Sequence, residues 1–189
     1  MPHGGCWSLI IGTFPFSIIL VYTKGQKRLY RALKPLPLKE FHERCDMAYR
    51  KMNKLQGTTL YFLRGPNEIP PFMIRSMFIN GIMYEENIIV SMLRRVDPFG
   101  VTGCFREEIG PGLKIFEIQA GYMEVFDVEE ILKEAGIDEN TIFYGLEEIV
   151  TDNIIWKIFS IIKRLNPTFV QFYKLPSHKL HGIITRIEM

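Results

Sequence analysis

The chain has 189 residues, 47% of them hydrophobic and 23% charged, with a formal net charge of +2. The hydrophobic content is ordinary for a folded chain, and the length leaves room for one folded domain beside a shorter N-terminal region. The charge is unevenly divided: residues 24–54 carry ten Lys/Arg and three Asp/Glu and hence +7, whereas residues 55–189 sum to −5. A nucleic-acid-binding protein would carry its positive charge on the folded domain, so a nucleic-acid partner is excluded.

The first feature along the chain is an apolar run, Cys6–Tyr22, whose seventeen residues include no charged side chain. A bilayer core about 30 Å thick needs roughly 17–25 apolar residues in a helix, which this run meets at the short end. Four cations follow it: Lys24, Lys27, Arg28 and Arg31. Positive charge after an apolar run, rather than before it, is typical of a membrane span whose C-terminal side faces the cytoplasm. We therefore expect a transmembrane helix over residues 1–23, with a buried core helix as the alternative.

A basic linker follows the expected span. Residues 25–34 read as a helix that Pro35 and Pro37 break, because proline lacks an amide proton and disfavours helix in the residue before it. Residues 38–55 read as a second helix, with the apolar positions Phe41, Cys45, Ala48, Met52 and Leu55 at helical spacing. We expect residues 24–55 to form juxtamembrane linker helices, with the four cations resting as a collar on anionic headgroups.

The remaining residues, 56–189, are expected to form one α/β domain with a mixed sheet. Short β-branched and aromatic runs predict strands, and proline, glycine and amphipathic signals predict helices between them. The expected strands are 58–63, 87–93, 101–108, 113–120, 141–144 and 182–187, with the pair around Gly110-Pro111-Gly112 forming a hairpin. The expected helices begin at Pro70-Pro71, at a capping box over Asp127–Glu130, and at Asn153. The last of these runs to Leu165 and is expected to turn one apolar face to the core.

The sequence offers no catalytic or metal-binding arrangement, so no enzyme activity, cofactor or metal is expected. Cys6, Cys45 and Cys104 have neither metal-ligand nor redox spacing, and their odd, sparse count fits a reducing compartment. His178 and His181 are three residues apart, but no third ligand lies near them in sequence. The paired glutamates are adjacent in sequence, so their side chains diverge in a strand or helix and are expected to face solvent.

One stretch is a candidate functional site: Gly121-Tyr122-Met123-Glu124. In the structural interpretation, Tyr122 and Met123 belong to the core and Gly121 relieves backbone crowding. In the functional interpretation, Tyr122 and Glu124 line a small-ligand pocket at the end of a strand. Both interpretations stay open on the sequence alone.

Several short motifs follow one another in a recognisable order. They are His3-Gly4-Gly5 with Trp7, Gly57-Thr58, Ile69-Pro70-Pro71, Gly121–Glu124 followed by Asp127-Val128, Phe143-Tyr144-Gly145 with Glu147, and Trp156 with Arg164-Leu165-Asn166. In this order they resemble the C-terminal part of the KUP/HAK/KT family of potassium uptake transporters. For example, Ile69-Pro70-Pro71 is similar to the family's "VPPALLHN" segment, and Gly121–Glu124 with Asp127-Val128 is similar to its "YGFMETPDVP" segment. The resemblance covers almost the whole chain.

The resemblance implies the last membrane span and the cytoplasmic domain of a potassium transporter, at the cell (inner) membrane. The family's ion path runs through earlier membrane helices, so the implied role is regulation or assembly of a potassium (proton-coupled) uptake unit, without transport by this chain alone. The expected partners are membrane lipid, the remaining transmembrane part of a transporter and, as an open alternative, a second copy of the chain. Two other functions also stay open, a small-ligand (nucleotide) sensing domain and a gene remnant without function.

Overall fold

The structure is a computed structural model that describes residues 4–63, 68–106, 109–165, 175 and 177–189. The described residues fall into two compact units. Unit 1 comprises residues 4–34, 147–165 and 186–189, and unit 2 comprises most of residues 35–146 together with 175 and 177–185. Each unit has a hydrophobic cluster of its own and is described separately.

Unit 2 contains four helical segments besides a one-turn 3-10 helix, η2 (Ser177–Lys179), in the part of the chain that is described. These are α2 (Leu38–Lys51), α3 (Pro71–Ile74), the π-helix η1 (Arg75–Ile79) and α4 (Val128–Glu134). Its strands are β1 (Leu36–Pro37), β2 (Leu55–Leu63), β3 (Glu68–Ile69), β4 (Tyr84–Arg94), β5 (Val101–Phe105) and β6 (Leu113–Ala120). Two longer strands, β7 (Thr141–Val150) and β8 (Leu180–Glu188), begin in unit 2 and end in unit 1.

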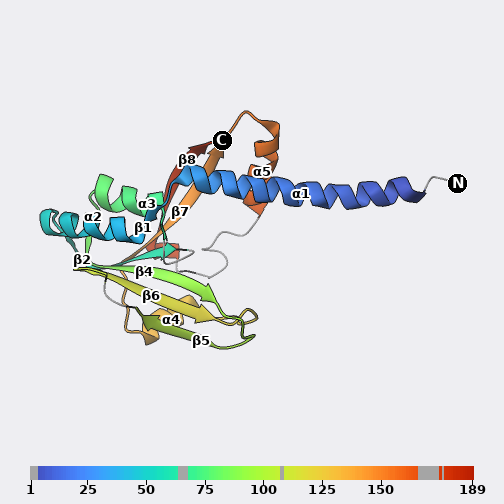
Figure 1. The fold of residues 1–189 in the computed structure, drawn as a ribbon. Coiled ribbons are helices and arrows are strands. Elements are labelled where there is room, and N and C mark those ends of the chain that lie inside the picture. The colour runs from blue at the N-terminus through green and yellow to red at the C-terminus, as the bar shows by residue number, and fades with distance from the viewer. Residues whose placement is uncertain (1–3, 64–67, 107–108, 166–174, 176) are drawn as a thin grey trace. The chain divides into compact units, whose positions relative to one another are not determined.

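The principal sheet has six strands in the order β5-β6-β4-β2-β7-β8 (Figure 1). Strand β2 pairs in parallel with β4 and with β7, and β4 pairs in parallel with β6. Strand β5 turns back antiparallel onto β6, as the predicted hairpin requires. A second, two-stranded sheet pairs β1 with β3. The expected α/β domain with a mixed sheet is confirmed.

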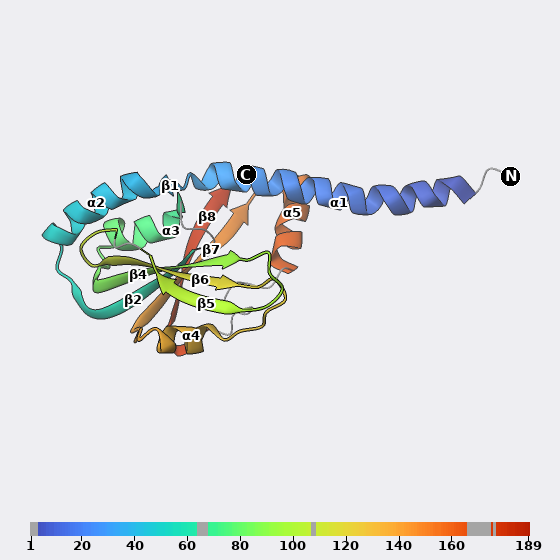
Figure 2. The same ribbon diagram turned by 60° about the horizontal axis from the view of Figure 1, so that its bottom comes forward.

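The central strands of unit 2 are buried on both faces, as parallel strands covered by helices are. On one face, Tyr61 and Ile89 pack beneath α2 and α3. On the other, Leu60 and Ile88 pack against α4, and Figure 2 shows α4 across the sheet from α2 and α3. Strand β6 divides in the same way, because Ile115 joins the first cluster and Phe116 the second. The uneven apolar pattern of this strand thus reflects two buried faces.

Several predicted boundaries were wrong. The helix expected over 38–55 ends at Lys51, and Leu55 opens β2 instead. The strand expected over 141–144 continues to Val150. In the expected capping box, the Asp127 carboxylate accepts a hydrogen bond from the Glu129 amide at 2.9 Å, one residue earlier than predicted. Each difference is a shift at the end of a correctly predicted element.

Unit 1 is built on two helices, α1 (Gly4–Leu33) and α5 (Ile154–Leu165). Helix α1 is continuous through the junction between the expected span and the linker, and it ends before Lys34, which has φ of 46°. A residue in this left-handed conformation, followed by proline, is a common end for a helix. Among the residues that the structure describes, no helix is long and apolar enough to cross a membrane, so the span expected over residues 1–23 is not shown.

Candidate functional site

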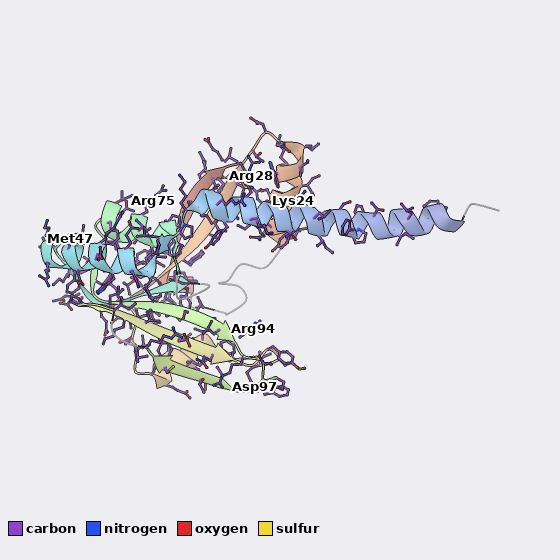
Figure 3. All side chains as sticks on the ribbon, in the orientation of Figure 1. Lys24, Arg28, Met47, Arg75, Arg94 and Asp97 are labelled. Carbon is purple, nitrogen blue, oxygen red and sulfur yellow. The ribbon has the colours of Figure 1, made fainter. Side chains whose placement is uncertain are left out.

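The four predicted collar residues form one stripe on the second half of α1. Lys24, Lys27, Arg28 and Arg31 stand at i, i+3, i+4 and i+7, which share one helix face, and all four side chains are exposed. Figure 3 shows Lys24 and Arg28 on this part of the helix, beside α5. The collar therefore exists as a continuous exposed basic face. Its contact with lipid headgroups stays a prediction.

The opposite face of α1 packs on α5. Leu29 is buried in a cluster with Phe159, and the rings of Tyr22 and Phe159 lie 6.0 Å apart. Gly25 makes this approach possible: a Cβ at that position would lie 2.3 Å from the Phe159 ring. The Arg28 guanidinium lies 5.1 Å from the centre of the Trp156 ring, within cation–π range. The basic stripe is thus carried by a helix whose rotation is fixed by packing.

The first half of α1 carries no charged side chain, and the side chains described there are exposed. Large side chains such as Trp7 and Phe14 are each 69% exposed. Leu9, Ile11, Phe16 and Ile18 are also exposed on this half, and Ile19 and Leu20 are exposed just beyond its middle. A helix that is apolar all round normally lies within a protein core or a membrane. Among the described residues, this half presents an exposed surface of large apolar side chains.

The predicted ligand residues Tyr122 and Glu124 lie in a turn after β6. The turn is tied to the segment after β4: the Glu124 carboxylate accepts from the Gly100 amide at 2.6 Å, and the Gly121 amide donates to the Gly100 carbonyl at 2.9 Å. The Arg94 guanidinium also donates to the Tyr122 carbonyl at 3.0 Å, and Figure 3 labels Arg94 and Asp97 at this end of the sheet. The structure therefore gives Glu124 a role in holding two loops together.

This geometry tests the structural interpretation of the turn. Gly121 does relieve crowding, because a Cβ there would lie 2.5 Å from the Pro98 carbonyl oxygen. The expectation that Tyr122 and Met123 belong to the core is wrong, since their side chains are 52% and 57% exposed. A ligand-binding role for Tyr122 and Glu124 stays a prediction.

A shallow apolar groove, which sequence reasoning missed, lies between α2 and the α3–η1 segment in unit 2. Its volume is about 440 Å³, and Met47, Phe78 and Ile79 are among the residues that line it, with Arg44 and Lys51 beside them. Figure 3 labels Met47 of α2, which lines the groove, and Arg75, which belongs to η1. Met47 and Met52 both line it, and they were the available signal, because flexible methionine side chains often line adaptable apolar surfaces.

In the described part of unit 2, burial and hydrogen bonds within the fold shift the pKa values of a few ionisable groups. Burial raises the pKa of the Cys45 thiol to about 12, with the Asp46 charge adding to the effect. A hydrogen bond from Lys114 is the main cause of a lowered pKa at Glu86. The exposed His181 ring packs against Phe143 at 5.7 Å between centres. Among the described residues, no group of His, Cys, Asp or Glu could hold a metal ion.

Comparison with known proteins decides the family. The family model described as "K+ potassium transporter C-terminal domain" matches residues 56–189. The chain belongs to this potassium transporter C-terminal domain family. Its relatives include the "Probable potassium transport system protein Kup" of Methanosarcina acetivorans, 51% identical over 189 residues, and that of Methanosarcina barkeri, 53% identical over 189 residues. Each alignment covers 100% of this chain and 31% of the relative. No solved structure matches.

The family assignment confirms the resemblance found in the sequence. The matched region begins at residue 56, one residue after the start of β2, and includes the six-stranded sheet and α5. The alignments with the relatives also include residues 1–55. The chain spans about a third of the length of these relatives, so the activity of the whole relatives is not by itself an activity of this chain.

Proposed function

We infer that this chain acts as the C-terminal domain of a potassium transport system, attached to the cytoplasmic face of the cell membrane. The observation that carries this inference is the match of residues 56–189 to the potassium transporter C-terminal domain, with Kup relatives about half identical over the full chain. Its role is to regulate or assemble the uptake unit, and it does not conduct potassium alone. The resemblance to the wider family implies that uptake by the unit is coupled to protons.

The attachment follows from the two halves of α1. The first half exposes large apolar side chains on all sides, and such a surface is most stable in the hydrocarbon of a membrane. The second half carries the exposed basic stripe Lys24, Lys27, Arg28 and Arg31, which is attracted to anionic headgroups. The helix thus passes from an apolar to a basic surface along its length, as a helix entering a cytoplasmic leaflet would.

Regulation is consistent with the close packing of the described part of unit 2. Its sheet is covered on both faces, and the buried side chain of Asn87 is engaged in structural hydrogen bonds. Any regulation requires that the domain favour one state of the transporter over another, because a contact that is equal in both states shifts nothing.

Potassium uptake in a transport-deficient strain tests the proposal. The cells would carry the Methanosarcina acetivorans relative without the region that matches this chain, and this chain would be supplied as a second polypeptide. We expect uptake from the pair and none from either piece alone. Uptake from this chain alone, or none from the pair with both pieces folded and in the membrane, would contradict the proposal. Repeating the assay at two external pH values tests proton coupling.

A further inference from the structure

Helix α5 has an apolar stripe that the fold does not cover. The sequence predicts one apolar face made of Ile155, Ile158, Phe159, Ile162 and Leu165. In the structure only Phe159 of this helix is buried. Ile154, Ile158, Ile161 and Leu165 stand at i, i+4, i+7 and i+11 and are all exposed, at 73%, 46%, 59% and 79%. Side chains at this spacing lie in one line along a helix. The stripe runs the full length of α5.

Two cations border this stripe. With 3.6 residues per turn, Lys157 and Arg164 both fall about 80° to one side of its centre, on the side away from Phe159. Both side chains are exposed, and α5 carries no acidic side chain. An apolar stripe with a Lys/Arg border is the pattern of a helix lying in the plane of a membrane surface, where long basic side chains reach the headgroups.

The packing of α5 leaves its apolar stripe exposed and available for binding. Phe159 faces Gly25 and Leu29 of α1 within unit 1, which turns the stripe away from that contact. Lys163, on another side of α5, pairs with Glu147. The helix is therefore held in one rotation by side chains outside the stripe, so that little ordering is needed when the stripe binds.

We propose that α5 is a second membrane-binding element, which lies in an anionic bilayer surface with Ile154, Ile158, Ile161 and Leu165 in the acyl boundary and Lys157 and Arg164 at the headgroups. The ligand is a bilayer rather than a protein helix, because the Lys/Arg border and the absence of acidic side chains complement anionic headgroups. The inference rests on the proposed attachment of α1 and adds a contact that orients unit 1 on the membrane.

A fluorescent label on the stripe tests this. In the full chain with Cys6→Ala and Cys104→Ser, Ile161→Cys provides the reactive thiol, because Cys45 is buried with its pKa raised to about 12. An environment-sensitive label there should brighten and shift to the blue when vesicles of phosphatidylcholine with phosphatidylglycerol are added. The matched control keeps Cys104 and Ile161, carries Cys6→Ala, and is labelled at the exposed Cys104. Its emission should not change.

The charge border has its own test. In the labelled chain, Lys157→Gln and Arg164→Gln should each reduce the inserted population of α5 by about fivefold, since one cation near an anionic surface contributes about that factor. A parallel label at Phe14→Cys reports insertion of α1, which these two substitutions should leave unchanged.

The two labels separate the possible failures. A response at position 14 without one at position 161 overturns the role of α5 and leaves the attachment of α1 standing. No response at either position overturns both. A response at position 161 that rises with protein concentration in the absence of vesicles would identify a second copy of the chain as the occupant and would also overturn the proposal.

Discussion

Asn87 shows how one buried side chain sets the register of the sheet. Its side-chain amide donates to the carbonyls of Tyr84 at 2.8 Å and Gly112 at 3.1 Å, and its carbonyl oxygen accepts from the Tyr84 amide at 3.2 Å. The residue is fully buried. It therefore joins the start of β4 to the turn before β6 in a place that water does not reach.

Replacing this side chain should be costly. Asn87→Ala removes the hydrogen bonds to the Tyr84 amide and carbonyl, and one of the two to the Gly112 carbonyl, which keeps the bond from the backbone amide of residue 87. A buried backbone group left without a partner costs about 1–3 kcal/mol. We expect the free energy of unfolding in urea to fall by about 2–4 kcal/mol. The matched control Asn53→Ala, at an exposed position between α2 and β2, should change it by less than about 0.5 kcal/mol. Equal effects of the two substitutions would show that the Asn87 hydrogen bonds are not stabilising.

Glu86 makes a pH-dependent contribution at the same edge of the sheet. Lys114 donates to it, and this hydrogen bond holds the pKa of Glu86 below its ordinary 4.5 in the folded protein. Because the folded pKa is lowered, the stabilisation is present above the unfolded value and is lost as the pH falls through the folded value. Both side chains are about a third exposed, so the contribution is small.

The substitution Glu86→Gln isolates this effect, because the amide keeps an oxygen that can accept from Thr58. At pH 7 the variant should be less stable by about 0.5 kcal/mol. The difference from the parent chain should disappear in acid, once Glu86 itself is protonated in the folded state. Urea unfolding at pH 7 and in acid measures it, and a difference that persisted in acid would point to packing instead of charge.

At the scale of elements, the contact between α1 and α5 depends on one glycine. Gly25→Ala would place a Cβ 2.3 Å from the Phe159 ring, so the ring or the helix must move. Gly12→Ala, on the same helix, meets nothing within 4 Å. Because alanine favours a helix over glycine by about 1 kcal/mol, the second substitution should stabilise α1 while the first loosens α5.

Hydrogen exchange distinguishes these two outcomes. The amides of α5 should exchange faster in the Gly25→Ala chain and at the parent rate in the Gly12→Ala chain. Unchanged exchange in both would mean that α5 does not depend on its contact with α1.

The sequence predicted the elements of unit 2 well because their signals are local. Short apolar runs and the glycine turn at 110–112 identify β4, β5 and β6 from a few neighbours. Sequence-based prediction failed where a contact with a distant part of the chain decides the local structure. Nothing near Gly25 in the sequence shows that Phe159 will pack on it. The glutamates at 147 and 148 hid the second half of β7, because they interrupt its apolar run.

The same limit applies to the candidate surfaces. The basic stripe on α1 was visible, because four cations at helical spacing need no partner to be recognised. The stripe on α5 was not, since an amphipathic helix is read as packing its apolar face inward, and only the structure shows that Phe159 alone is buried. The exposed Tyr122 and Met123 likewise belong to a turn held by distant partners, because their amides donate to the carbonyls of Asp97 and Pro98.

At the scale of the whole molecule, the chain combines a domain of the potassium transporter C-terminal family with an N-terminal helix that changes from apolar to basic along its length. In our account the helix attaches the domain to a membrane and the domain acts on a transport unit. The account therefore requires that this chain can take the place of the matching region in a relative and support its function. The two sequences are about half identical over this region.

The most direct measurement is potassium uptake by a graft in which this chain replaces the matching 31% of the Methanosarcina acetivorans relative. The control graft would carry Asn87→Ala and Gly25→Ala, which weaken unit 2 and the α1–α5 contact separately from any lipid-facing residue. We predict that a transport-deficient strain takes up potassium with the intact graft and much less with the control. A folded, membrane-inserted intact graft that gave no uptake would contradict the assignment of this chain to a potassium transport unit.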